Sequence, residues 1–226
     1  MIRAKLLIAT RNPGKCREVA AILDGLNLEL LTLDAYADLP DPVEDADTFE
    51  GNARKKALYY AEQTQHWALA DDSGLEVDAL GGAPGVLSAR FSLSEPRAQA
   101  LGHVCPTSHP TKSTSRQSLD AANNAKLIAI LRDVPPARRT ARFRCVLALA
   151  RPGEILATAE GSFEGRIIDD PRGTNGFGYD PHFFVPEHSM TAAQLPPSLK
   201  NAISHRAKAL AAIRPILMEL LSNQTE

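Results

Sequence analysis

The chain has 226 residues, of which 44% are hydrophobic and 23% charged, and its formal net charge is −2. These proportions are typical of a globular protein with a substantial core, and the length fits one large domain. The small net charge gives no electrostatic case for a nucleic acid or an anionic membrane as partner. The apolar run at residues 6–9 is too short for a signal sequence or a membrane span, so we expect a cytoplasmic location.

The first third of the chain alternates predicted strands and helices. In chain order, the pattern predicts a strand over 4–10, a helix opened by Pro13 and running to about 23, a strand over 28–33, a proline-bearing acidic loop over 38–47, a helix begun by a capping box of Asp47 and Glu50, and a strand over 67–70. This βαβαβ order favours an α/β fold.

The remaining elements are less regular. They are a helix over 121–131, two strands over 142–150 and 155–168 joined by a hairpin at Pro152-Gly153, a short strand over 182–185, and a long terminal helix that Ser198 can cap and Pro215 should kink. Residues 102–118 are rich in Ser, Thr, Pro and His and lack periodicity. We expect them to form a surface loop or insertion and not a second domain.

Two adjacent acids, Asp71 and Asp72, follow the apolar strand and precede Ser73-Gly74. Because a buried strand does not keep an ionised carboxylate in its interior, we expect the pair at the strand end, on the face where α/β sheets carry their sites. Neighbouring strand residues face opposite sides, so one of the two acids would enter a given site. Such oxygen ligands suit Mg2+. The alternative interpretation is a solvated acidic turn.

The turn Thr10-Arg11-Asn12-Pro13-Gly14-Lys15 joins the first strand to the first helix. Free backbone N–H groups at a helix start bind anions, Gly14 permits close approach, and Lys15 adds a positive charge on a flexible stem. The turn is therefore a candidate phosphate site, although its spacing and glycine count are not those of a Walker A sequence. An ordinary strand-to-helix turn is the alternative.

The terminal helix carries an arginine on its apolar side. At about 100° per residue, Arg206 falls inside the apolar arc, whereas Lys200 lies at the margin and His205 points elsewhere. An arginine on a buried helix face needs an anionic or acceptor partner. In the alternative interpretation, the first turn overhangs solvent and Arg206 snorkels.

Residues 173–180 form a glycine-dense segment with two aromatic rings and one carboxylate. Its glycines let rings approach a planar ligand, so Phe177 or Tyr179 could stack on a base, and Asp180 could accept from ring N–H groups. As pure structure, the segment would be a wide turn whose rings cover the core.

Taken in order, the motifs of this chain resemble those of the inosine/xanthosine triphosphate pyrophosphatases, which hydrolyse deaminated purine nucleoside triphosphates. The matching stretches are Ile8-Ala-Thr-Arg-Asn-Pro-Gly-Lys15, Thr48-Phe-Glu-Gly-Asn-Ala53, Ala70-Asp-Asp-Ser-Gly-Leu75, Gly81-Gly-Ala-Pro-Gly85, Gly176-Phe-Gly-Tyr-Asp180 and Ser204-His-Arg206. Each stretch is modest, but the ordered set is specific and covers nearly the whole chain.

The resemblance implies a role for each matching residue. The turn from Thr10 to Lys15 would hold the triphosphate, and Ser73 would also touch substrate. Asp72 corresponds to the catalytic carboxylate, and with Glu44 it would hold Mg2+. The residues expected around the base are Phe177, which would stack on the purine, Gly178, Tyr179 and Asp180 of the same loop, and Lys200, His205 and Arg206, which would read the edge of the base.

The family fold implied is a long mixed sheet flanked by helices, with the substrate in a cleft between two lobes. Residues 1–226 would form a single such domain, with 97–118 as a surface-loop insertion, and many members are homodimers. The chain departs from the family pattern at Arg11, where many members have glycine.

Three other functions compete with this interpretation. A related pyrophosphatase of modified pyrimidine nucleotides would keep the chemistry and change the substrate, but the Ser204-His205-Arg206 trio and the Phe177 loop argue against it. A nucleotide sensor without turnover is disfavoured by the presence of Lys15, Glu44 and Asp72. For a purely structural module, the segment over 102–118 is the one positive indication.

Overall fold

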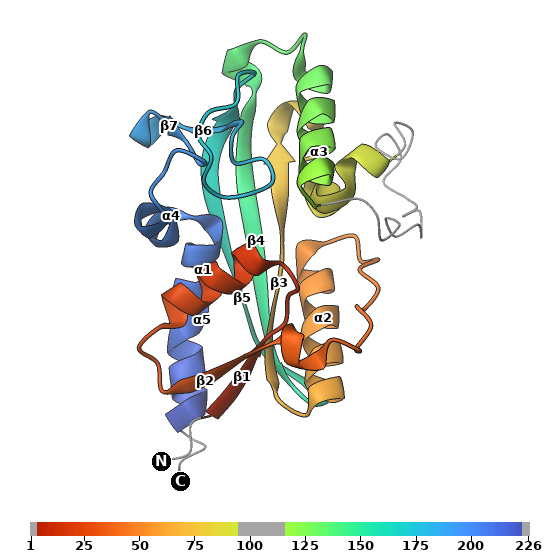
Figure 1. Cartoon of the computed structure of the whole chain (residues 1–226), viewed down its shortest axis with the longest axis vertical. Coiled ribbons are helices and arrows are strands. Elements are labelled where there is room, and N and C mark those ends of the chain that lie inside the picture. The colour runs from red at the N-terminus through yellow and green to blue at the C-terminus, as the bar shows by residue number, and fades with distance from the viewer. Residues whose placement is uncertain (1–3, 95–115, 223–226) are drawn as a thin grey trace. The chain divides into compact units, whose positions relative to one another are not determined.

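The computed structural model describes residues 4–94 and 116–222 (Figure 1). Within these ranges the strands are β1 (Ala4–Ile8), β2 (Leu28–Thr32), β3 (Trp67–Val77), β4 (Thr140–Arg151), β5 (Glu154–Ile167), β6 (Phe183–Val185) and β7 (Met190–Thr191). The helices are α1 (Pro13–Leu23), α2 (Phe49–Thr64), α3 (Arg116–Leu131), α4 (Pro197–Ile203) and α5 (His205–Ser222), with short 3-10 helices between some of the elements.

Over the described residues, the strands form one mixed sheet in the order β2-β1-β3-β4-β5-β6-β7. β1 pairs in parallel with both β2 and β3, whereas β6 pairs antiparallel with β5 and β7. The predicted α/β class, the βαβαβ start and the β4–β5 hairpin are confirmed.

The chain divides into two compact units. Unit 1 comprises Met1–Ser73, Arg144–Phe163 and Lys200–Glu226, and unit 2 comprises Gly74–Phe143 and Glu164–Leu199. Strands β3, β4 and β5 therefore contribute residues to both. The cleft between two lobes and the single-domain organisation of residues 1–226 stay predictions.

The core of unit 1 packs α1 and α5 against one face of the sheet. Leu6 and Ile8 of β1 are buried there with Val19 of α1 and with Leu210 and Ile213 of α5. Helix α2 lies on the opposite side of these strands (Figure 1). Because consecutive strand residues face opposite sides, adjacent side chains on β3 meet different helices.

Helix α1 begins at Pro13, as predicted, whereas the bounds of α2 and α3 differ from those predicted. Thr48, and not Asp47, caps α2, and its hydroxyl accepts a hydrogen bond from the backbone N–H of Gly51 at 3.1 Å. Within the described residues, α3 spans Arg116–Leu131, so residues 116–118 are helical although the expected loop included them. The rest of the predicted insertion, residues 97–115, lies outside the described residues.

The predicted terminal helix is two helices. Ser198 lies inside the short α4 and does not cap it. The helix is interrupted at Ser204, whose hydroxyl accepts a hydrogen bond from the N–H of Ala207 at 3.2 Å and so caps α5. Pro215 is inside α5 and does not end it. In residues 4–94 and 116–222, no helix has both the length and the apolar character needed to cross a membrane.

Candidate active site

The two acids lie inside β3 and not at its end, because β3 continues through Ser73 to Val77. The side chains of Asp71 and Asp72 are almost fully buried. The expectation that carboxylates terminate the strand was wrong because burial of charge is costly only when it is uncompensated. Here Asp71 meets cations from α1 and α5, and Asp72 meets a cation and a donor from α2.

Asp71 receives donors from the side of α1 and α5. Its Oδ2 atom lies 2.8 Å from Lys15 Nζ and 3.2 Å from Arg206 Nη2, and it accepts from the Ser73 hydroxyl at 3.1 Å. Burial alone would raise the pKa of Asp71, but the attraction of Lys15 and Arg206 outweighs it and lowers the pKa. Asp71 is therefore an ionised carboxylate whose Oδ2 atom is bonded by three protein groups.

Asp72 faces α2. Asn52 Nδ2 donates to its Oδ2 at 3.1 Å, and Lys56 Nζ lies 3.5 Å from its Oδ1. The pKa of Asp72 is raised by burial, which the attraction of Lys56 only partly offsets. The prediction that the two adjacent acids serve different sides is confirmed. Of the two, Asp72 is better suited to accept a proton.

Sequence reasoning missed Lys56, which joins the two acids predicted to hold metal. Its Nζ lies 3.3 Å from Glu44 and 3.5 Å from Asp72, and its side chain is 10% exposed. Burial would lower the pKa of Lys56, but Asp72 and Glu44 raise it, so it stays charged. Its spacing of four residues from Asn52 was the available signal, since that spacing places both on one helix face.

Glu44 and Asp72 thus face a common positive charge. Among the described residues, no three His, Cys, Asp or Glu side chains gather as a preformed metal cluster. Mg2+ is commonly held by one or two carboxylates together with waters and substrate phosphates, and a pair of acids converging on one cation suits that mode. Burial raises the pKa of Asp72, so its carboxylate is less fully compensated by neighbouring positive charge than that of Asp71.

The start of α1 is capped by Asn12. The Oδ1 atom of Asn12 accepts from the N–H groups of Gly14 at 2.9 Å and Lys15 at 3.5 Å, and Pro13 occupies the first helical position. The sequence analysis expected these amides to be free, but the Asn12 side chain already engages them. The Asn12 side chain is 8% exposed, and its Nδ2 group has no hydrogen-bond acceptor among residues 4–94 and 116–222. An acceptor-bearing ligand would satisfy that donor.

Arg206 is 1% exposed, so the snorkelling interpretation is wrong and the predicted need for an anionic partner is confirmed. Its Nη1 donates to Glu18, and its Nη2 donates to Asp71 and Ser73. Glu18, which the sequence analysis missed, also pairs with Lys200 at 3.5 Å. It lies one helical turn after Lys15, on the helix that the phosphate turn opens.

His205 is buried beside these cations. Burial, together with the positive charges of Arg206 and Lys200, lowers its pKa well below the ordinary value for histidine. The imidazole is therefore neutral at physiological pH and has one donor and one acceptor nitrogen.

Arg11 is directed toward the acidic loop. Its Nε donates to Asp41 at 2.7 Å, and its Nη2 donates to the carbonyl of Leu39. The guanidinium is thus engaged by protein groups that lie outside the turn that carries it.

The glycine-rich loop belongs to unit 2. The N–H of Phe177 donates to Asp180 Oδ2 at 2.9 Å, and Gly178 has φ +63°, in the left-handed region that favours glycine. Tyr179 is 4% exposed, and its hydroxyl donates to the carbonyl of Ser88 at 2.8 Å. The ring of Tyr179 therefore covers the core, as the structural alternative held, and Phe177 is the half-buried ring of the pair.

The predicted residues of unit 1 come together. Three helices each bring one cation to the Asp71–Asp72 pair. These cations are Lys15 of α1, Lys56 of α2 and Arg206 of α5. The loop of residues 177–180 lies in unit 2 and is described by itself. A hollow of about 630 Å3 in unit 2, lined by residues such as Ile128 and Pro181, contains none of the predicted site residues. We therefore place the candidate site by its charges and not by this hollow.

Comparisons with known proteins agree with the motif pattern. A sequence model of the Ham1 family matches residues 6–216. The dITP/XTP pyrophosphatase of Geobacter sulfurreducens is 50% identical over 210 residues, which are 93% of this chain and 94% of that protein. The protein of the same name from Desulforamulus reducens is 47% identical over 97% of this chain and 98% of its own length. The structure of a HAM1 protein from Coxiella burnetii superposes with a TM-score of 0.77 and 36% identity, covering 96% of this chain and 99% of that one. This chain therefore belongs to the Ham1 family.

Proposed function

We propose that this protein hydrolyses the deaminated purine nucleotides dITP, ITP and XTP to the monophosphate and pyrophosphate, removing them from the nucleotide pool. Relatives at 47–50% identity carry the name dITP/XTP pyrophosphatase. The observation that carries the proposal is the buried Asp71–Asp72 pair, at which Lys15, Lys56 and Arg206 meet. Such a concentration of compensated charge is common where charged groups are used in catalysis or binding.

The turn from Thr10 to Lys15 would hold the triphosphate, with Asn12 and Lys15 as its direct contacts. The Nδ2 donor of Asn12, which lacks an acceptor among the described residues, would bond a phosphate oxygen. Lys15 would divide its charge between Asp71 and the phosphates, and Lys56 would neutralise charge that develops as the anhydride breaks. Ser73 would touch the substrate from β3.

Asp72 would act as the general base. It would take a proton from a water molecule, whose oxygen attacks the α-phosphorus while the bond from that phosphorus to the bridging oxygen breaks. The products are a nucleoside monophosphate and pyrophosphate, so one water is consumed in each turnover. The raised pKa of Asp72 makes it a stronger base than an exposed aspartate.

Glu44 and Asp72 are the residues that would hold Mg2+. When bound, the ion would neutralise and orient the phosphates. Lys56 would hold the two carboxylates close together, because its ammonium pairs with both Glu44 and Asp72.

The base would be recognised by Lys200, His205 and Arg206, with Phe177 stacking on the purine and Gly178, Tyr179 and Asp180 in the same loop. A 6-oxo purine presents an acceptor where adenine presents a donor, so cationic groups at the edge favour inosine and xanthosine. Adenine would instead present an amino donor to the cationic Lys200 and Arg206, which lowers its affinity.

Product analysis tests the proposal. Purified protein with Mg2+ should convert dITP and XTP to monophosphate and pyrophosphate, while dATP and dUTP should react far more slowly. Orthophosphate and a diphosphate would indicate a different reaction, and faster turnover of dUTP would indicate the pyrimidine alternative. Tight nucleotide binding without turnover of any triphosphate would support the sensor function.

The same proposal takes residues 1–226 as one catalytic domain that works as a homodimer in the cytoplasm. It rests on the behaviour expected from the family resemblance. Size-exclusion chromatography with light scattering tests the dimer, for which the expected mass is twice the 24.4 kDa of one chain.

A further inference from the structure

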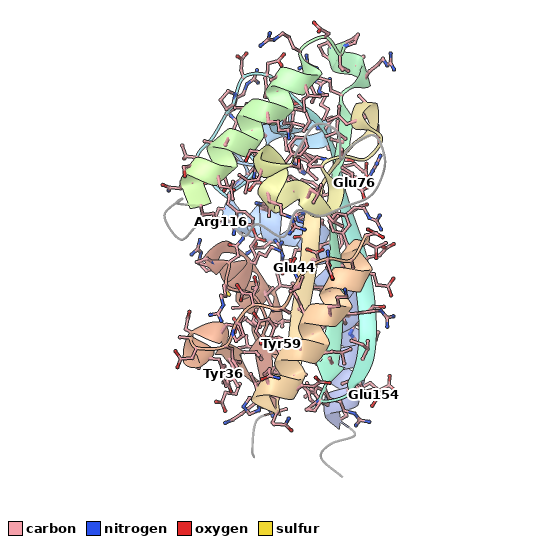
Figure 2. The ribbon with its side chains drawn as sticks, turned by 90° about the vertical axis from the view of Figure 1, so that its right-hand side faces the viewer. Tyr36, Glu44, Tyr59, Glu76, Arg116 and Glu154 are labelled. Carbon is pink, nitrogen blue, oxygen red and sulfur yellow. The ribbon has the colours of Figure 1, made fainter. Side chains whose placement is uncertain are left out.

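One face of α2 contacts the acidic loop at three successive turns. The contacting helix residues, Asn52, Lys56 and Tyr60, are spaced by four, so they lie in a row on the helix surface. Their partners in the loop are Ala46 for Asn52, Glu44 for Lys56 and Asp41 for Tyr60. The loop therefore runs antiparallel to α2 and is tied to it along its length. Figure 2 shows Glu44 on the same side of unit 1 as this helix.

The three ties do different things. Asn52 holds the backbone N–H and carbonyl of Ala46 at 2.9 and 3.4 Å, and the same amide donates to Asp72. Lys56 holds Glu44 and Asp72 together. In the third tie, the hydroxyl of Tyr60 donates to Asp41 at 2.8 Å.

Arg11 closes that third tie from the opposite side. Its Nε donates to the same Oδ1 atom of Asp41 that accepts from Tyr60, and its Nη2 donates to the carbonyls of Leu39 and Tyr36. The Arg11–Asp41 bond raises the pKa of Arg11, and burial and Asp41 together raise the pKa of Tyr60, so both groups stay protonated donors. A residue of the phosphate turn is thereby linked to the loop that carries Glu44.

The loop is suited to transmit such a restraint. Asp41 lies between Pro40 and Pro42, whose rings restrict the backbone, and Glu44 follows two residues after Pro42. Pinning Asp41 therefore limits the positions that the Glu44 backbone can take.

We infer that Arg11, Asp41 and Tyr60 form a clamp that positions Glu44 against Lys56 and Asp72. The inference rests on the proposed function, in which Glu44 is a metal-holding acid. In the clamp, Arg11 is a positioning residue that acts through Glu44, and not the substrate contact that its place in the turn suggested.

The geometry requires an arginine and not only a positive charge. Two different nitrogens of the planar guanidinium reach a carboxylate and two carbonyls, and the single nitrogen of a lysine does not reproduce this fork. The Asp41 side chain is 61% exposed and that of Arg11 is 35% exposed, so this pair adds little to global stability. Its loss should change where the loop lies and leave the melting temperature nearly unchanged.

The test compares Arg11→Ala, Arg11→Lys and Tyr60→Phe with the unaltered protein. In all three, the Mg2+ concentration giving half-maximal dITP hydrolysis should rise, by roughly three- to tenfold for Arg11→Ala, since the partly exposed bonds to Asp41 and to the carbonyls of Leu39 and Tyr36 are lost. The KM for dITP at saturating Mg2+ should stay within about twofold. Arg54→Ala and Tyr59→Phe are matched controls on α2, because Arg54 pairs with Glu50 and Tyr59 is the neighbour of Tyr60.

A second readout does not depend on activity. Hydrogen exchange measured without nucleotide or metal should quicken at residues 38–47 in Arg11→Ala and Tyr60→Phe, and stay unchanged in the two controls. If this faster exchange appears while the protein turns over no triphosphate, the proposed function fails and the structural clamp stands.

A double mutant separates the clamp from direct substrate binding. In a Glu44→Gln background, Arg11→Ala should have little further effect on turnover, because its route through Glu44 is already broken. The inference is overturned if the two effects multiply, if Arg11→Ala raises the KM for dITP with unchanged Mg2+ dependence, or if Arg11→Lys behaves like the unaltered protein.

Discussion

Lys15 and Arg206 bond the same carboxylate oxygen, Oδ2 of Asp71, at 2.8 and 3.2 Å. One cation comes from the phosphate turn of α1 and the other from α5, so Asp71 links both helices to β3. All three side chains are at most 14% exposed. A buried carboxylate with two cations is stable as a set, and removing the shared member leaves the two cations close together, with Lys15 deprived of its buried partner and Arg206 held by Glu18 alone among the carboxylates of the described residues.

Asp71→Asn should therefore destabilise the fold by about 3–5 kcal/mol at neutral pH. The pKa of Asp71 is lowered in the folded protein, so its contribution is present above the unfolded value and is lost as the pH falls through the folded value. The difference from the unaltered protein should accordingly shrink in acid. Urea unfolding over a pH series measures this, with the exposed Asp24→Asn as control. A difference that does not vary with pH would contradict the assignment.

Asp72→Asn should lower kcat by roughly a hundredfold to ten-thousandfold, because the amide cannot accept the proton of the attacking water. Because the pKa of Asp72 is raised and not lowered in the fold, loss of its charge should destabilise the protein less than Asp71→Asn does, and circular dichroism and the melting curve check that the fold persists. Asp47→Asn, an exposed acid of the nearby loop, is the control. Unchanged kinetics in Asp72→Asn would remove this residue from its proposed role.

The local sequence pattern was sufficient to predict most helices and strands and to single out the two adjacent acids. Apolar periodicity located α1, α5 and the βαβαβ order, and the anomalous position of Arg206 indicated a buried ion pair. The extent of β3 was misjudged because the charges of Asp71 and Asp72 are compensated by residues far away in sequence. The residues that neighbour Asp71 in sequence do not reveal which distant cations will compensate its charge.

The partners were missed for the same reason. Glu18 and Lys56 are ordinary charged residues on amphipathic helices, and a solvated position is the usual expectation for them. What makes them part of the site is the rotation of α1 and α2 about their axes, which is decided by packing against the sheet. A spacing of four residues between Asn52 and Lys56 predicts a shared face but not what that face meets.

The pH dependence of catalysis should report the Lys56–Asp72 contact. Burial raises the pKa of Asp72 and Lys56 lowers it, so the net value lies above that of an exposed aspartate. The rate constant kcat/KM should fall in acid as Asp72 is protonated. Lys56→Gln removes the lowering influence, and so the acid limb should move to higher pH. Lys55→Gln, whose partner is the exposed Asp45, is the control. An acid limb that moves to lower pH, or does not move, would contradict this contact.

The conformation of the loop before Tyr179 should depend on two residues of α3, which bond the N–H and the carbonyl of Gly178. Asp120 Oδ2 accepts from the N–H of Gly178 at 3.0 Å, and Asn124 Nδ2 donates to its carbonyl at 2.9 Å. Because Gly178 has a left-handed backbone, these bonds select a conformation that the chain would otherwise leave easily, and they set where Phe177 projects. Asp120→Ala and Asn124→Ala should each raise the KM for dITP by roughly three- to tenfold, with a smaller change in kcat. Steady-state kinetics beside Asp133→Ala, an exposed acid after the same helix, measures the effect. If the KM does not rise in either variant, α3 does not position this loop for binding.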